Sequence, residues 1–356
     1  MTDILIIGAG IAGLSLAARL APKASVTVLE AETAPGYHAS GRSAALYEAN
    51  YGLPSTVALN KASGEFFREG GYLSPRGLML VGTADEGDGF AADCNTLGLD
   101  PMTLDDALEM VPILDPAKVT RAAHHGAAWD IDTDRLLQDH VKTLRAYGGT
   151  LHTQTRADDI TRTGGVWQVT AGTQVWSAPI LVNAAGAWAD EVAGLAGVAR
   201  IGLTPLRRSM ARIAAPGGHD LRRWPMLMGV GETWYAKPDA GALIVSPSEE
   251  DPSHPHDAWA DDLVLAEGMA RYQEVVTEDV TRPLATWAGL RSFAPDRALV
   301  LGRAAAQPDF VWCAGQGGYG FQTSPAASQL LADVILGAQS GLPESLIWAL
   351  SPERFD

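Results

Sequence analysis

The stretch Asp3-Ile-Leu-Ile-Ile-Gly8-Ala-Gly10-Ile-Ala-Gly13, continuing through Leu20 to Val26-Thr-Val-Leu-Glu30, decides the fold. Its first apolar run fits a buried parallel strand, and Ile11 to Leu20 fits the helix that follows. Gly8 permits a tight turn, Gly10 lets a pyrophosphate approach, and Gly13 lets the helix pack on the strand. Glu30 ends a second strand and can accept hydrogen bonds from a ribose. Together these features predict a dinucleotide site, without separating FAD from NAD.

The composition narrows the class of protein. At 356 residues the chain is long for one core, so two lobes are expected, and 47% of its residues are hydrophobic. A formal charge of −16 argues against partners such as nucleic acid or an anionic membrane surface. Cys94 and Cys313 lack metal or redox spacing and predict buried thiols in a reducing, cytoplasmic compartment. The apolar start lacks a basic leading region, so neither a signal sequence nor a membrane span is expected.

A second loop of small residues follows Glu30. The segment Gly36-Tyr-His38-Ala-Ser40-Gly41-Arg42-Ser43-Ala-Ala-Leu46-Tyr47 is predicted to open into a helix at Ser43. Such a loop suggests another anion or ring held by backbone amides, and an ordinary surface loop is the alternative. An NAD-binding unit would normally continue directly into the next helix and strand, so this loop favours FAD.

The later segments predict two kinds of sheet. The strand at 180–182 ends in a small-residue turn and a helix at 189–195, which is typical of the ligand-binding edge of a parallel sheet. Residues 203–290 alternate polar and apolar residues between turns, which indicates an antiparallel second lobe. The chain then returns through a strand at 310–314, the turn Gly315-Gln-Gly-Gly-Tyr-Gly320 and a helix at 322–335. The positive end of that helix could stabilise the negative charge of a reduced flavin.

No metal site is expected. Asp130, Asp132 and Asp134 precede a helix and lack the glycine and closing glutamate of a calcium loop, so an N-cap is the preferred interpretation. His254 and His256 lie in an acidic segment, 248–262, that is predicted to be an exposed loop, where histidines are more often solvated than bound to metal.

Several of these segments together resemble a known family. Gly36-Tyr-His-Ala-Ser-Gly-Arg-Ser-Ala-Ala resembles the second flavin-binding loop of the D-amino-acid oxidase and glycine oxidase superfamily, and the similarity is greatest to bacterial D-arginine dehydrogenases. It extends through Asp130-Ile-Asp-Thr-Asp134, Leu181-Val-Asn-Ala-Ala-Gly-Ala-Trp188, Pro205-Leu-Arg-Arg-Ser209, Tyr235-Ala-Lys-Pro-Asp-Ala-Gly241, Trp287-Ala-Gly-Leu-Arg-Ser-Phe293 and Gln316-Gly-Gly-Tyr-Gly-Phe-Gln-Thr-Ser324.

The resemblance implies a site for noncovalent FAD, although His38 is a conceivable covalent attachment point. The residues that would bind the cofactor are Gly8, Gly10, Ile11, Ala12, Gly13, Glu30, Ala31, Ser40, Gly41, Arg42, Ser43, Ala44, Ala45, Leu46, Ala157, Ala185, Gly186, Trp188, Gly289, Arg291, Gly317, Gly318, Tyr319, Gly320, Phe321, Gln322 and Thr323. The implied fold is an α/β Rossmann-like FAD-binding domain of the glutathione-reductase type, from 1–75, 135–200 and 287–356. An α+β substrate domain with a mostly antiparallel sheet would comprise 76–134 and 201–286.

Arg208 and Arg291 are the candidates for substrate binding. A guanidinium matches a carboxylate bidentately, although spacing alone favours surface salt bridges for both. In the family the matching positions hold the substrate carboxylate, Tyr51 and Tyr235 match residues that bind the same end, and the Gly318 carbonyl faces the amine. The implied reaction is hydride transfer from Cα to flavin N5 without a side-chain base, followed by hydrolysis of an imino acid to a 2-oxo acid and ammonia.

Two departures from the D-arginine dehydrogenases bear on the substrate. Leu78 stands where they have an acid that pairs with the cationic tail, and Leu46 stands where they have a histidine. A guanidinium beside Leu78 would be poorly solvated, so neutral, apolar D-amino acids are the expected substrates. Glu48 is the one nearby residue that could restore a cation site.

Several alternatives stay open. A secondary amine such as sarcosine or proline, or a 2-hydroxy acid, would suit the same carboxylate clamp. A flavin-binding subunit or sensor without turnover is the alternative outside enzymes. The electron acceptor is a quinone or O2, with a dehydrogenase favoured by resemblance alone, and the protein is expected to be a monomer or small homo-oligomer.

Overall fold

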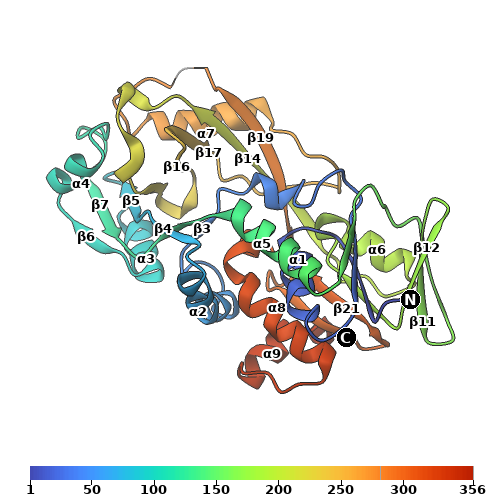
Figure 1. The fold of residues 1–356 in the computed structure, drawn as a ribbon. Helices are drawn as coiled ribbons and strands as arrows, with labels where there is room; N and C mark the ends of the chain where they lie inside the picture. Colours follow the sequence, from blue (N-terminus) through green and yellow to red (C-terminus); the bar gives the residue numbers. More distant parts are fainter. Residues whose placement is uncertain (281, 356) are drawn as a thin grey trace.

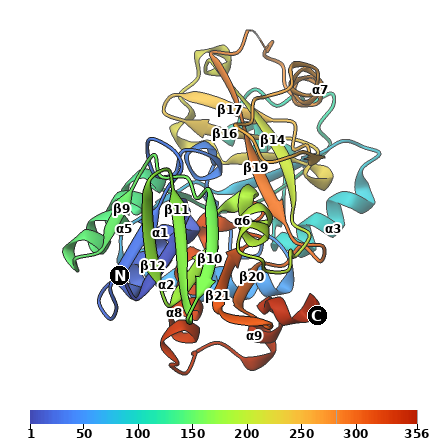
Figure 2. The ribbon, with the colours of Figure 1, turned by 90° about the vertical axis from the view of Figure 1, so that its right-hand side faces the viewer.

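The computed structural model describes residues 1–280 and 282–355, and its first layer is a six-stranded sheet in the order β20-β21-β13-β1-β2-β9. All neighbouring strands in this sheet are parallel except β20 and β21, which are antiparallel. Both chain termini lie in this part of the molecule (Figures 1 and 2). The strands are β1 (Ile4–Ile7), β2 (Val26–Leu29), β9 (Thr150–His152), β13 (Ile180–Asn183), β20 (Val300–Ala304) and β21 (Gln307–Ala314).

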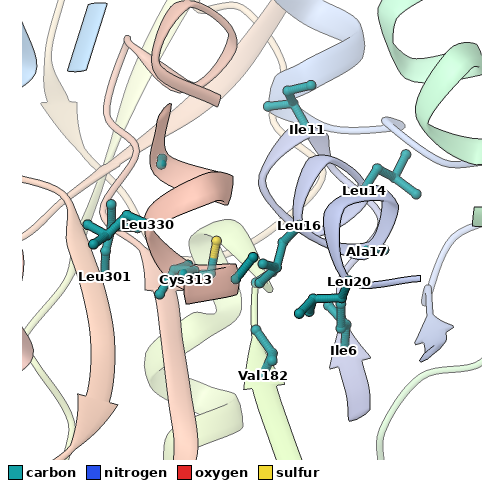
Figure 3. Close-up of a cluster of buried hydrophobic side chains, with 14 of the residues drawn as sticks. Ile6, Ile11, Leu14, Leu16, Ala17, Leu20, Val182, Leu301, Cys313 and Leu330 are labelled. Atoms are coloured by element: carbon teal, nitrogen blue, oxygen red, sulfur yellow. The ribbon is translucent and has the colours of Figure 1, made fainter. Parts of the chain in front are cut away.

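Strand β1 shows why this sheet is buried on both faces. Ile4 and Ile6 pack into a core with α1 (Ile11–Leu20), α5 (Thr133–Ala146) and α8 (Gly320–Leu336), part of which is drawn in Figure 3. Leu5 and Ile7 alternate with them and face a second core. That core is closed by α6 (Ala189–Leu195) and by three antiparallel strands, which Figure 2 shows side by side: β10 (Asp159–Thr163), β11 (Val166–Ala171) and β12 (Gln174–Ala178).

The other large layer is a nine-stranded sheet in the order β18-β14-β17-β16-β15-β5-β7-β6, with β19 also paired to β14. Only the contact between β5 and β15 is parallel among the pairs described in it. Figure 1 shows this sheet away from the six-stranded one. Its strands are β5 (Leu78–Gly82), β6 (Asp100–Met102), β7 (Arg121–His125), β14 (Thr204–Ile213), β15 (Met226–Gly229), β16 (Tyr235–Asp239), β17 (Ala242–Ser246), β18 (Asp251–Pro252) and β19 (Ala285–Phe293).

The long antiparallel pair β14 and β19 places both candidate arginines on one face. Leu206 is opposite Arg291 and Arg208 is opposite Gly289, so the two arginines have the same parity along their strands. The ladder therefore fixes the separation of the two backbone positions.

Short elements complete the chain. A small sheet is formed by β3 (Leu46–Tyr47), β8 (Trp129–Ile131) and β4 (Leu73–Pro75). The other helices are α2 (Pro54–Glu69), α3 (Gly87–Leu97), α4 (Leu104–Met110), α7 (Asp262–Gln273) and α9 (Glu344–Leu350). Single 3-10 turns are η1 (Ala39–Arg42), η2 (Gly186–Trp188), η3 (Pro216–Gly218), η4 (Leu221–Arg223), η5 (Val230–Glu232) and η6 (Pro352–Phe355).

The predicted fold class is confirmed, and one local prediction is wrong. No helix begins at Ser43, because that residue is extended (φ −79°, ψ 139°) and Ala45 has a φ of 36° before the chain enters β3. The segment is held by tertiary contacts described below rather than by helical hydrogen bonds. The domain boundaries given above stay a prediction. Among the described residues, no helix is both long enough and apolar enough to span a membrane, and Cys94 and Cys313 are buried and free.

Candidate active site

The turn after β1 has the geometry that a bound phosphate requires. Gly8 has a φ of 104°, and a Cβ there would lie 2.4 Å from the carbonyl oxygen of Ala184. A Cβ on Gly13 would lie 2.0 Å from the carbonyl oxygen of Gly8, so α1 packs against the turn only because Gly13 is a glycine. The N-terminus of α1 therefore faces the cavity edge with its backbone at close range.

Glu30 is held in place at the end of β2. Its Oε2 accepts the backbone N–H of Ala9 at 2.7 Å, and its Oε1 accepts that of Glu32 at 2.9 Å. The residue is only 9% exposed. A carboxylate has about four lone-pair positions, so it can still accept a ribose hydroxyl from the cavity that it lines.

Three adjoining cavities run from Glu30 into the second sheet. We name the first the nucleotide cavity, and its lining includes Glu30, Ala31, His38, Ala157 and Trp188. The second, the central cavity, is bounded by Ile11, Ala12, Met210, Gly289 and Gly317 among others. The third, the inner cavity, is lined by Ser43, Ala44, Ala45, Leu46, Glu48, Tyr51, Leu78, Leu97, Met226, Met228, Glu232, Tyr235, Arg291, Gly318, Phe321 and Gln322. The first two share Gly10, and the last two share Arg291, so the three cavities are neighbours in this order.

The second small-residue loop is fixed between the two large sheets. Ser40 Oγ accepts the N–H of Ile11 at 3.0 Å, which caps the start of α1. Arg42 Nη1 donates to the carbonyl oxygens of Ala258 (2.8 Å) and Ala288 (3.0 Å). These contacts explain why the expected helix does not form.

The segment 248–262 is a largely exposed loop, as predicted, but part of it is drawn against the nucleotide cavity by the same contacts. Ala258 is 7% exposed, and both it and His256 line the nucleotide cavity. Asp257 is exposed but forms an ion pair with Arg42. The segment therefore closes one side of the nucleotide cavity, which its acidic and proline-bearing sequence did not indicate.

Most of the predicted cofactor residues line these cavities, and four of them act otherwise. Gly13 packs against Gly8, as described above, and a Cβ on Gly41 would lie 2.5 Å from the carbonyl oxygen of Gly36. Tyr319 is the N-cap residue of α8, and Thr323 is buried with its hydroxyl donating to the Tyr319 carbonyl oxygen at 2.9 Å. These four residues shape the backbone of the site.

Arg291 is the cation that faces the inner cavity most freely. In the part of the chain that the structure describes, its guanidinium makes no hydrogen bond or ion pair. A Cβ on Gly318 would lie 2.9 Å from Nη1 and 3.0 Å from Cζ, so the guanidinium lies flat against that glycine. Burial acts to lower the pKa of Arg291, but electrostatic interactions with its neighbours, among them the carboxylate of Glu232, outweigh it and raise that pKa above its ordinary value. Arg291 is therefore a fixed positive charge that can bind an anionic group such as a carboxylate.

Arg208 and Tyr51 lie near Arg291, but both already form hydrogen bonds with Glu232. Arg208 Nη1 donates to Glu232 Oε1 at 3.0 Å, and the Tyr51 hydroxyl donates to Glu232 Oε2 at 2.7 Å. Burial, and then the charge of Glu232, raise the pKa of Tyr51 well above its ordinary value, so it remains a donor. Glu232 has a φ of 53° in the turn between β15 and β16. Sequence reasoning missed it; the only signal was an acid three residues before Tyr235.

The lining of the inner cavity is partly polar and partly apolar. Near Arg291, the buried hydroxyl of Tyr235 has no hydrogen-bond partner among the described residues. The lining also includes the apolar side chains Leu46, Leu78, Leu97, Met226 and Met228, which pack in one hydrophobic cluster, and the carboxylate of Glu48. The cavity thus offers a small anion a cationic and hydroxyl lining and offers an apolar chain a hydrophobic one.

The candidate metal ligands of the sequence have other partners. Asp130 is paired with Arg76 at 2.6 Å and with Lys237 at 2.9 Å. Asp132 is the N-cap residue of α5, as predicted, and accepts the N–H of Arg135. The rings of His254 and His256 stack with centroids 4.6 Å apart.

Comparison with known proteins agrees with this geometry. The family described as FAD dependent oxidoreductase (DAO) matches residues 3–334. Hydrogen cyanide synthase subunit HcnC of Pseudomonas aeruginosa is 27% identical over 244 residues, which are 63% of this chain and 55% of that protein. The match thus spans about half the length of that relative.

Solved structures share the fold. L-proline dehydrogenase from P. horikoshii has a TM-score of 0.84 at 23% identity, covering 99% of this chain and 97% of the other. FAD-bound L-α-glycerophosphate oxidase from Mycoplasma pneumoniae has a TM-score of 0.86 at 17% sequence identity, and the match covers 96% of this chain and 97% of the other. Glycine oxidase from Geobacillus kaustophilus has a TM-score of 0.80 at 20% sequence identity, and the match covers 98% of each chain.

The cofactor of this family fits the residues of this site. The glycine turn leaves no room for side chains, Glu30 lines the cavity where a ribose would bind, and the last of the neighbouring cavities is lined by Arg291, whose guanidinium is unpaired among the described residues. With the family match over residues 3–334, the chain belongs to the DAO family of FAD-dependent oxidoreductases, and its cofactor is FAD.

Proposed function

We propose that the protein oxidatively deaminates neutral, apolar D-amino acids to 2-oxo acids and ammonia. The observation that carries this proposal is the mixed lining of the inner cavity, which combines Arg291 and Tyr235, whose polar groups have no partner among the described residues, with a cluster of leucines and methionines. A carboxylate would bind to the first group and an aliphatic side chain against the second. Leu78, where D-arginine dehydrogenases have an acid, supports a neutral side chain.

The residues of the chain act by positioning. Arg291 and Tyr235 bind the substrate carboxylate, and Arg208 and Tyr51 border the same end through Glu232. The carbonyl oxygen of Gly318 faces the substrate amine and orients the Cα–H toward the central cavity. Bound FAD supplies the hydride acceptor there. No side-chain base takes part, because an amine that binds in its neutral form already provides the electron pair that assists hydride loss.

Further features of the holoenzyme belong to the same proposal. FAD is held noncovalently, since His38 bonds to Glu32 at 2.9 Å and lines the nucleotide cavity together with Glu30, at the ribose end. The electron acceptor is a quinone or O2. We expect a cytoplasmic monomer or small homo-oligomer.

The test is an anaerobic absorbance titration of the purified holoenzyme with matched D- and L-amino acids. The flavin bands, near about 370 and 450 nm, report reduction directly. We expect bleaching by D-Leu, D-Met or D-Phe and not by the L-enantiomers. Air restoring the colour would indicate an oxidase, and restoration only by a quinone would indicate a dehydrogenase. Bleaching only by L-amino acids, by secondary amines such as proline, or by 2-hydroxy acids would overturn the substrate assignment. No bleaching by any of these would favour a flavin-binding subunit or sensor.

A further inference from the structure

A buried histidine and carboxylate lie in contact beside the apolar lining of the inner cavity. His125 Nε2, on β7, is 3.1 Å from Oε2 of Glu48, which follows β3. Their side chains are 10% and 5% exposed. Glu48 lines the cavity next to Leu78 and Leu97. A buried carboxylate in an apolar environment changes the free energy of binding of any substrate side chain that enters the inner cavity.

The hydrogen bonds around the pair fix the tautomer of His125 when its imidazole is neutral. The N–H of Ala127 donates to His125 Nδ1 at 3.0 Å, so this nitrogen is an acceptor and the ring proton is on Nε2, facing Glu48. Glu48 Oε1 accepts the N–H of Asn50 at 2.9 Å. With neutral imidazole, the pair has a net charge of −1. A second proton on Nδ1 would displace the Ala127 N–H and bring the net charge to zero.

Other charges near His125 favour its second proton. The adjacent carboxylate of Glu48 raises the pKa of His125 above its ordinary value, burial opposes this, and the charge of Asp100 adds to the increase. Asp100 lies on β6, which pairs with β7. His124, the neighbour on β7, has a pKa lowered by burial and by His125. The pair therefore changes its net charge when His125 loses its second proton.

We propose that Glu48 and His125 form a charge switch that sets which side chains the inner cavity accepts. This rests on the proposed function. With neutral imidazole, Glu48 offers a countercharge to a cationic side-chain end, because its oxygens retain free lone pairs. With imidazolium, the countercharge is cancelled and the cavity prefers neutral side chains. The relative preference for a cationic substrate rises as the pH rises through the pKa of His125.

The experiment compares two substrates of equal shape. D-arginine and D-citrulline differ mainly in the charge of the side-chain end, so effects of pH on the α-amine and on the flavin cancel in their ratio. We expect the ratio of their kcat/KM values to increase about tenfold or more between about pH 6 and pH 9, the scale expected for a charge-assisted hydrogen bond. A ratio independent of pH in the native enzyme would overturn the proposal.

Three variants locate the effect. His125→Gln keeps a donor toward Glu48 but cannot be protonated, so the ratio should stay at its high-pH value throughout. Glu48→Gln should hold the ratio low at every pH. His124→Gln is the matched control on the same strand and should retain the native pH dependence. An unchanged pH dependence in His125→Gln that retains its flavin spectrum would refute the assignment.

A binding measurement separates this proposal from the proposed function. The des-amino analogues of arginine and citrulline keep the carboxylate and side chain but cannot be deaminated, and their binding is followed by the change in flavin absorbance. If no amino acid reduces the flavin, the proposed function fails, while a pH-dependent ratio of the two dissociation constants would still support the switch. If D-amino acids reduce the flavin but neither ratio depends on pH, only the switch fails.

Discussion

Replacing Gly318 with alanine tests the carboxylate site through geometry alone. Gly318 does not have a positive φ, so alanine fits its backbone, and the added Cβ would lie 2.9 Å from Arg291 Nη1. That is about 0.5 Å closer than the 3.4 Å at which ordinary contact begins, so the guanidinium must move away. A misplacement of about 1 Å in a substrate-positioning group can cost about 100-fold in rate, so we expect kcat/KM for a neutral D-amino acid to fall about tenfold.

The assay measures steady-state kinetics together with melting temperature and flavin content. Gly341→Ala is the matched control, because a Cβ there meets nothing within 4 Å. We expect Gly318→Ala to raise KM and to weaken the binding of a simple carboxylate, with flavin content and melting temperature close to those of the control. An unchanged KM would refute the placement of Arg291 as the carboxylate ligand. A loss of flavin would show that the turn mainly serves the cofactor.

Three further variants give distinct readouts. Arg291→Met should lower kcat/KM about 30-fold or more, since losing a buried charge pair with the substrate costs at least about 2 kcal/mol. The melting temperature of the ligand-free variant should be unchanged or higher. A variant that is less stable but still active would contradict this assignment. Glu30→Gln turns an amide toward the N–H of Ala9 or Glu32, so FAD affinity measured by fluorescence titration should weaken by about 1–3 kcal/mol. Burial lowers the pKa of His140 to about 4 from 6.5, so only the unfolded state binds its proton between these values. Stability should therefore fall as the pH drops through that window, by roughly 3 kcal/mol in full, and denaturant unfolding of His140→Phe should lack this loss.

Local sequence patterns predicted the helices and strands whose formation depends mainly on residues within the same segment. The strand at 4–7, the helix at 11–20 and the helix at 189–195 have the predicted bounds, because the spacing of glycines and apolar residues determines them directly. The family resemblance, rather than spacing, indicated Arg208 and Arg291 as a pair. Their common face depends on the pairing of β14 with β19, which no local pattern contains.

What sequence reasoning missed depends on distant contacts. The small residues around Ser43 predict a helix, but Arg42 is bound to the carbonyl oxygens of Ala258 and Ala288, more than two hundred residues away. Glu232 pairs with Arg208 only because a turn with positive φ brings it there. His125 is likewise brought to Glu48 by the packing of β7, and nothing in its neighbourhood along the chain predicts a charged partner.

Because of the ladder between β14 and β19, binding of the substrate carboxylate and recognition of the substrate side chain depend on different elements. The ladder anchors Arg291 in register, whereas the apolar lining of the inner cavity comes from other elements, including Leu78 on β5 and Met226 on β15. Side chains in that lining can be exchanged without moving a single ladder hydrogen bond. Variants that recognise a different substrate side chain should therefore be accessible by small steps, each retaining the means of binding the carboxylate, and this modularity suits the scaffold to directed evolution.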